Sequence, residues 1–301
     1  SMNLNGNNSV IGMLVGGTNV AITGNTISNL SFTGTAATGA VVSGILGGPT
    51  ATYTVSNNTI SRLSNASANT GTGASAAING ISVAGTTTGG TLVSQNTISE
   101  LNCTAATASM SMNGISVTST STTGTNIVER NLIHSFSNIS TGAAVVFNGL
   151  LASSTTSFTY RNNMIRLGID ASAASVASDC QINGINEQAG TNNFYHNSVY
   201  LGGTVATAAN NTFAFNSAVT ANARNYFNNI FFNARSSTAG AGKNYAIQVG
   251  GTSANPAGLS SNYNLLLANG TGGVTGRFNA LDQATLADWR TTTGQDLNSI
   301  S

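Results

Sequence analysis

Short apolar segments recur along this chain at a nearly constant interval. Each centres on an asparagine that has an apolar residue two positions later and an apolar or aromatic residue three positions earlier. The asparagines are Asn25, Asn58, Asn96, Asn131, Asn163, Asn197 and Asn229, with a degenerate eighth member at Asn262 or Asn264. The steps between the first seven are 33, 38, 35, 32, 34 and 32 residues. Apolar and polar residues that alternate over so few positions indicate short β-strands with one buried side.

A second marker precedes most of these asparagines by 13 to 17 residues. It is a glycine followed by a methionine, isoleucine or leucine, found at Gly12, Gly44, Gly80, Gly114, Gly149 and Gly184. Helical spacing is absent, and each unit is too short to bury its apolar side alone, so neighbouring units must pack on one another. The sequence therefore predicts an all-β solenoid of about eight coils.

The recurring order of Gly-Ile, short strand, turn, second strand and Asn-x-Ile resembles the right-handed parallel β-helix of the pectate-lyase-like superfamily, over about residues 10–266. The resemblance implies that the seven asparagines, Asn25 to Asn229, point inward at one turn and stack as a hydrogen-bonded structural ladder. It also implies a bacterial protein of secreted or cell-surface type. Serine-, threonine- and alanine-rich stretches such as residues 64–78 predict long loops on one side of the coils.

The last part of the chain has a different pattern. We expect residues 1–268 to form the β-helix and residues 269–301 to form a C-terminal cap or partial last coil within the same domain. Asp282 is a candidate helix cap, Leu286 and Trp289 fall on a helical stretch, and Gly294 is a stop signal. Trp289 is the expected anchor of this cap in the core.

Composition excludes several partners. Only 6% of the residues are charged and the net charge is +1, so the chain lacks the basic surface that nucleic-acid binding requires. No apolar run reaches membrane-spanning length. The opening SMNL is typical of a cloning remnant, so the lack of a signal peptide is uninformative. Two cysteines, Cys103 and Cys180, are too few for a disulfide framework or a metal site, and we predict that they are unbonded. We expect a monomer of the excised domain without cofactor or metal.

Acidic residues are scarce and badly placed for catalysis. β-Helix lyases and hydrolases need carboxylates that act in pairs or bind Ca²⁺. Of five aspartates, Asp282, Asp288 and Asp296 lie in the terminal segment, and no D-x-D motif occurs. We therefore assign no catalytic residue, and we lean against an enzyme. Glu187 falls where other coils carry valine, so either the strand ends early and Glu187 turns outward, or a paired carboxylate sits at the edge of the core.

Reactive side chains gather at the outward positions of the fourth to sixth coils. They are Glu129, Arg130, His134, Arg161, Arg166, Tyr195, His196 and Tyr200. Stacked coils would bring them into one patch. Three alternatives stay open for it: a solvated face with a Glu129–Arg161 ion pair, a surface that binds glycans, for which arginine and aromatic side chains are suited, and a catalytic site.

Function is predicted less directly than fold. The first hypothesis is a non-catalytic solenoid module of a secreted or cell-surface bacterial protein, structural, adhesive or glycan-binding, with a polysaccharide or cell-surface glycan as partner. The alternative is a carbohydrate-active enzyme, a polysaccharide lyase or glycoside hydrolase, with its site on the outer face of coils 4 to 6. An ice-binding surface would need an array of paired threonines, but Leu132 and Met164 interrupt the column that Thr26, Thr59 and Thr97 begin.

Overall fold

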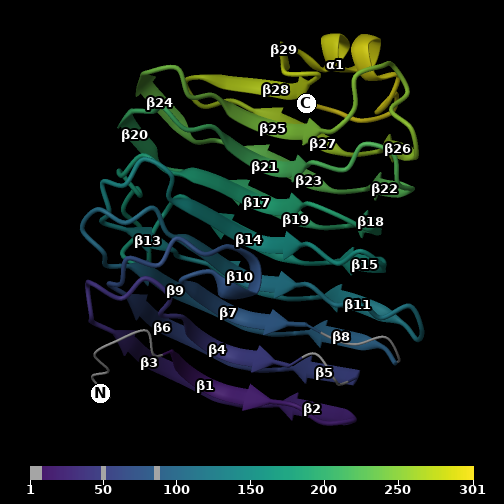
Figure 1. Ribbon diagram of the computed structural model, residues 1–301. Coiled ribbons are helices and arrows are strands. Elements are labelled where there is room, and N and C mark those ends of the chain that lie inside the picture. The colour runs from purple at the N-terminus through teal and green to yellow at the C-terminus, as the bar shows by residue number, and fades with distance from the viewer. Residues whose placement is uncertain (1–8, 49–51, 85–88) are drawn as a thin grey trace.

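The chain folds into a parallel β-solenoid of about seven turns that ends in one short helix (Figure 1). A computed structural model describes residues 9–48, 52–84 and 89–301. Each turn passes through three parallel sheets in succession, and the coils stack from the purple N-terminal turn to the yellow C-terminal helix. The predicted all-β solenoid is confirmed.

Three large sheets and one small sheet make up the solenoid. The ten-stranded sheet contains β1 (Val10–Val15), β4 (Val42–Gly47), β7 (Ile78–Val83), β10 (Ser111–Val117), β14 (Val146–Ala152), β17 (Gln181–Glu187), β21 (Thr212–Ser217), β25 (Asn244–Val249), β28 (Gly273–Phe278) and the antiparallel β29 (Leu281–Gln283). The eight-stranded sheet contains β2 (Asn19–Thr23), β5 (Thr52–Ser56), β8 (Thr91–Ser94), β11 (Asn126–Glu129), β15 (Ser157–Arg161), β18 (Thr191–Tyr195), β22 (Arg224–Phe227) and β26 (Leu259–Asn262).

The remaining strands lie on the third side of the coils. The nine-stranded sheet contains β3 (Thr26–Phe32), β6 (Thr59–Asn65), β9 (Thr97–Cys103), β12 (Leu132–His134), β13 (Ser137–Asn138), β16 (Met164–Leu167), β19 (Ser198–Leu201), β23 (Ile230–Asn233) and β27 (Leu265–Ala268). The small sheet pairs β20 (Thr204–Thr207) with β24 (Ser236–Ala239). A single turn of 3-10 helix, η1, spans Gly73–Ser75.

Strands one turn apart pair in register, so each coil sets the same kind of residue beside its neighbour. In the nine-stranded sheet Ile60 pairs with Ile98, which pairs with Ile133, and all three side chains are fully buried. Behind the eight-stranded sheet the rings of Tyr160 and Phe194 stack with centroids 4.7 Å apart. The core is therefore a set of continuous apolar columns that run along the solenoid axis.

The predicted asparagine ladder is confirmed at the corner between the eight- and nine-stranded sheets. The side-chain Nδ2 of each member donates to Oδ1 of the next, over 2.9–3.0 Å, in the order Asn25, Asn58, Asn96, Asn131, Asn163, Asn197, Asn229 and Asn264. Each backbone N–H donates to the same oxygen. The eighth member is Asn264, so the sequence ambiguity between Asn262 and Asn264 is resolved.

This ladder ends on a buried carboxylate. Asn264 Nδ2 donates to Asp296 Oδ1 at 2.9 Å. The same carboxylate accepts hydrogen bonds from Trp289 Nε1 and from the hydroxyls of Ser261 and Ser299. All four neighbours donate hydrogen bonds to Asp296. The last rung is therefore completed by a carboxylate, which accepts hydrogen bonds and donates none.

A second ladder, which we did not predict, borders the ten-stranded sheet. Its members donate Nδ2 to Oδ1 of the preceding coil over 2.8–2.9 Å, in the order Asn183, Asn148, Asn113 and Asn79. Each of the four directly precedes a marker glycine. These glycines are required because a Cβ on Gly80 would lie 2.5 Å from the carbonyl oxygen of Gly114 on the next coil. The Asn-Gly pairs therefore combine a close backbone stack with a side-chain ladder.

The C-terminal segment closes the last coil. Helix α1 (Leu286–Thr293) ends at Gly294, which adopts φ +68°, and Trp289 is fully buried, so the predicted stop and core anchor are confirmed. The predicted cap, Asp282, is wrong because that residue lies in the antiparallel strand β29. Thr285 caps the helix instead, in a reciprocal capping box with Asp288.

Both cysteines are free, as predicted, and both are buried. Burial raises the pKa of the Cys180 thiol to about 12. A buried thiol of such high pKa is unreactive, since the thiolate is the nucleophile and the metal ligand.

Candidate functional site

The eight reactive residues of coils 4 to 6 fall on two surfaces that meet at the ladder corner. On the eight-stranded side and at the corner lie Glu129, Arg130, Arg161, Tyr195 and His196, which we call the turn patch. On the nine-stranded sheet lie His134, Arg166 and Tyr200, side by side on β12, β16 and β19. The corner turns the chain between positions 129 and 134, so the single patch expected from the sequence is divided.

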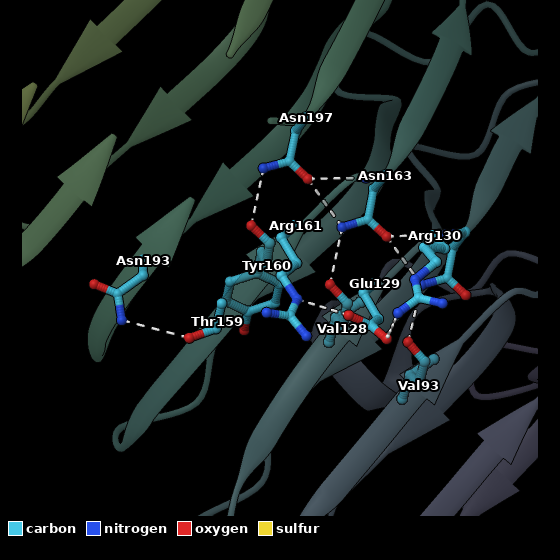
Figure 2. Close-up of polar contacts among 11 residues, drawn as sticks. Val93, Val128, Glu129, Arg130, Thr159, Tyr160, Arg161, Asn163, Asn193 and Asn197 are labelled. Carbon is cyan, nitrogen blue, oxygen red and sulfur yellow. Dashed lines mark hydrogen bonds and ion pairs between the residues drawn. The ribbon is translucent and has the colours of Figure 1, made fainter. Parts of the chain in front are cut away.

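Glu129 is the centre of the turn patch. Its two oxygens accept from Arg161 Nε at 2.6 Å and from Arg130 Nη2 at 2.9 Å, beside the asparagine ladder (Figure 2). The carboxylate is buried, whereas the side chains of Arg130 and Arg161 are 55% and 42% exposed. The Glu129–Arg161 pair of the solvated-face alternative is thus formed, and each guanidinium keeps N–H groups on the surface.

The corner presents outward side chains at regular spacing. Arg130, Asn162 and His196 each directly precede a ladder asparagine and adopt the left-handed backbone conformation, with φ between 54° and 55°. Consecutive coils are about 4.8 Å apart, so Arg130 and His196 lie about 10 Å apart along the axis. Beside them the ring of Tyr195 lies 6.3 Å from that of Phe227, at an interplanar angle of 39°.

A groove of about 430 Å³ runs along the outer face of the nine-stranded sheet. We call it the sheet groove. Its two walls come from positions two residues apart on the same strands, which point to the same side of the sheet. One wall contains Leu132, Met164, Ser198 and Ile230, and the other contains His134, Arg166, Tyr200 and Phe232.

Exposed apolar side chains distinguish this groove from the turn patch. Leu132, Met164 and Ile230 are 37%, 60% and 44% exposed. Ser198 is small and leaves a gap in the wall between Met164 and Ile230, opposite Tyr200. In the sequence, Leu132 and Met164 stand out only as interruptions of a threonine column. The replacement of threonine by large apolar residues at this outward position is the sequence feature that indicates the groove.

Protonation of His134 is set by its place in the groove. Partial burial lowers the pKa of His134, and the positive charge of Arg166 lowers it further, against a smaller opposite effect of Glu100. Its Nδ1 lies 2.8 Å from Ser135 Oγ. His134 is therefore largely uncharged near neutral pH, and Arg166 is the cation of the groove.

Glu187 lies inside the solenoid, which settles the two alternatives left by the sequence. Its carboxylate is fully buried and accepts hydrogen bonds from Ser217 Oγ, Tyr226 OH and Asn192 Nδ2. Burial raises the pKa of Glu187, although these hydrogen bonds and the charge of Arg224 oppose the rise. The strand does not end early; a paired carboxylate replaces the valine of other coils.

We predict that Glu187→Gln changes how stability depends on pH. The raised pKa of Glu187 in the folded state means that its contribution to stability is complete below the unfolded pKa and is lost as the pH rises through the folded pKa. Glutamine removes this titration, and the hydroxyls of Ser217 and Tyr226 can accept as well as donate. The melting temperature of the variant, measured from pH 4 to pH 9, should rise relative to the parent with pH. Glu100→Gln is the control, and an equal pH profile for both variants would contradict the prediction.

Across residues 9–48, 52–84 and 89–301, histidine, cysteine, aspartate and glutamate form no group of three that could hold a metal ion. In the same ranges, no helix is long and apolar enough to cross a bilayer.

Comparison with protein families, with curated proteins and with solved structures finds no match to this chain.

Proposed function

We propose that this chain is a non-catalytic β-solenoid module of a secreted or cell-surface bacterial protein, and that it binds a glycan through the turn patch. The observation that carries the proposal is the Glu129 carboxylate held between two partly exposed arginines, with Tyr195 in register beside Arg161 on the following coil. The repeated coils supply a rigid frame for this surface, and the resemblance to the pectate-lyase-like superfamily supports a role in carbohydrate recognition.

The chemistry of the turn patch suits sugars. Sugar hydroxyls both donate and accept, and the patch offers remaining guanidinium N–H donors on Arg130 and Arg161 together with the imidazole of His196. Tyr195 supplies an apolar ring face with a polar tip, which suits the alternating C–H and hydroxyl surfaces of a sugar ring. The ion pairs fix Glu129 and Arg161 in place, so little side-chain entropy is lost when a ligand binds.

A carbohydrate-active enzyme with a site on the outer face of coils 4 to 6 is the alternative. Glycoside hydrolysis by the common mechanism needs two carboxylates that flank the bond. The in-register neighbours of Glu129 are Ser94 and Arg161, and both of its oxygens are engaged by arginine. This arrangement favours binding over hydrolysis.

The experiment is a glycan array with the purified protein, followed by titration of the glycans that bind. We predict that Arg161→Ala, Tyr195→Ala and His196→Ala together weaken binding by more than about tenfold, because the change removes a cation and two rings from the contact surface. Tyr195→Ala and His196→Ala should each change stability by about 0.5 kcal/mol or less. Arg161→Ala should cost about 1.5–3 kcal/mol, because it removes one partner of the buried Glu129 carboxylate, which keeps Arg130. Circular dichroism checks that the triple variant is folded.

The matched control removes the same three residue types from the other surface: His134→Ala, Arg166→Ala and Tyr200→Ala. Glycan binding should be retained in this variant. Equal loss in both triple variants, or none in the first, would place recognition outside the turn patch. Release of reducing ends from a bound polysaccharide would instead support the enzyme alternative.

A further inference from the structure

The floor of the sheet groove offers a ligand few hydrogen-bonding partners. It is formed by the strands β16, β19 and β23, which pair in parallel on both sides, so their backbone groups are used within the sheet. The side chains between the walls, such as Ile165 and Val199, point into the core and are buried. A sugar hydroxyl placed here would lose water without gaining a partner, which is unfavourable. The groove therefore selects an apolar body, unlike the turn patch.

One wall nevertheless carries a cation without a bound counter-ion. Both ion pairs in the described parts of the chain belong to Glu129, so Arg166 takes part in neither. The nearby carboxylate of Asp170 accepts hydrogen bonds from Ser172 and Ala174 in its own loop. The hydroxyl of Ser172 is the main cause of the lowered pKa of Asp170, and the charge of Arg166 contributes least. A guanidinium at the edge of an apolar groove is suited to pairing with the anionic group of a ligand.

We propose that the sheet groove binds a small amphipathic carboxylate, whose aliphatic or aromatic body lies along the groove and whose carboxylate pairs with Arg166. The volume of about 430 Å³ falls within the range of about 300–1,000 Å³ that is typical of small-molecule sites. The gap at Ser198 receives the apolar body between Met164 and Ile230. The T-shaped pair of Tyr200 and Phe232, with centroids 5.3 Å apart, forms the facing wall. This site is independent of the glycan surface on the other side of the corner.

Octanoate and its neutral counterpart 1-octanol test the proposal by NMR titration of the full chain. We expect octanoate to bind more tightly than octanol to the parent protein. Arg166→Gln should weaken octanoate roughly five- to tenfold, as expected for a lost charge-assisted hydrogen bond, and leave octanol unchanged. Ser198→Met should weaken both ligands, because its side chain fills the gap.

The control is Arg161→Gln, which removes the same charge from the turn patch and should leave both ligands unaffected. The proposal is overturned if octanoate does not bind the parent, if Arg166→Gln and Arg161→Gln bind it equally, or if Ser198→Met binds both ligands as well as the parent. Circular dichroism of each variant confirms that it is folded, so loss of binding reports on the groove.

Discussion

Replacing Asp296 with alanine is expected to destabilise the protein by about 3–5 kcal/mol, because several buried donors lose their acceptor and each unsatisfied donor costs about 1–3 kcal/mol. The substitution removes the acceptor of four buried donors and leaves Trp289 Nε1 without its partner. It also breaks the link between Asn264 and the cap, so the last coil loses the segment that shields it. The chain has a single tryptophan, Trp289, whose fluorescence reports directly on the cap during urea denaturation.

Asp288→Ala is the matched control, because it removes an equal charge from the same C-terminal segment, within helix α1. Asp288 belongs to the exposed capping box, so its loss should reduce stability by only about 1 kcal/mol. We expect the fluorescence midpoint of Asp296→Ala to fall well below that of Asp288→Ala. Equal midpoints would show that the carboxylate of Asp296 does not secure the cap.

The first ladder could be predicted from the sequence because the solenoid repeats one environment in every coil. An asparagine at this corner is hydrogen-bonded to the asparagines of the coils before and after it. Asparagine is therefore needed at the same position of every coil, and it recurs in the sequence. The same logic predicted the core, since Ile60, Ile98 and Ile133 recur at equivalent positions. Only the steps of 32 to 38 residues needed to be recognised.

The end of the ladder could not be predicted in this way, because it occurs once. Asp296 lies in the non-repeated segment, and its role depends on three-dimensional contacts with Ser261 and Asn264 from the last coil. The second ladder was visible as Asn-Gly at positions such as 79–80 and 113–114. In these pairs the glycine is the more regular signal, because it continues at each marker position, whereas the asparagine is present in only four of them.

The candidate site was only partly predictable for a different reason. Sequence spacing placed Glu129 and Arg161 on adjacent coils correctly, because both belong to one column. It did not show that the corner at Arg130 separates Glu129 from His134 by a change of sheet. The direction of the backbone at a corner depends on residues that adopt the left-handed conformation, such as Arg130. Arginine has no preference for this conformation, so the sequence does not reveal the corner.

The two ladders have opposite directions, and each ends on a charge of the matching sign. In the first, every amide donates toward the C-terminus, and the final acceptor is the Asp296 carboxylate. In the second, donation runs toward the N-terminus, and a chain through Asn216 and Gln248 begins at the guanidinium of Arg277. A cation at the donor end and an anion at the acceptor end both strengthen a polarised series of hydrogen bonds.

This direction predicts that Asn131→Asp is more harmful than Asn131→Ala, although aspartate is nearly the same shape. Asn131 Oδ1 accepts from Asn96, but its Nδ2 donates to Val93 O and to Asn163 Oδ1. A carboxylate would place an oxygen against two acceptors and bury a charge without a counter-ion, for a loss of about 3–5 kcal/mol, compared with about 1–3 kcal/mol for alanine.

Urea denaturation at pH 7 and pH 4 measures the difference. Lowering the pH should restore part of the stability of Asn131→Asp, because a protonated carboxyl can donate to one of the two acceptors. The control is Asn162→Asp, the same substitution at the exposed corner of the next coil, where a change within about 0.5 kcal/mol is expected at either pH. If Asn131→Asp is no worse than Asn131→Ala at pH 7, the ladder does not have the direction described. If it is worse at pH 7 and recovers at pH 4, the ladder tolerates a carboxylate only where every neighbour donates, as at Asp296.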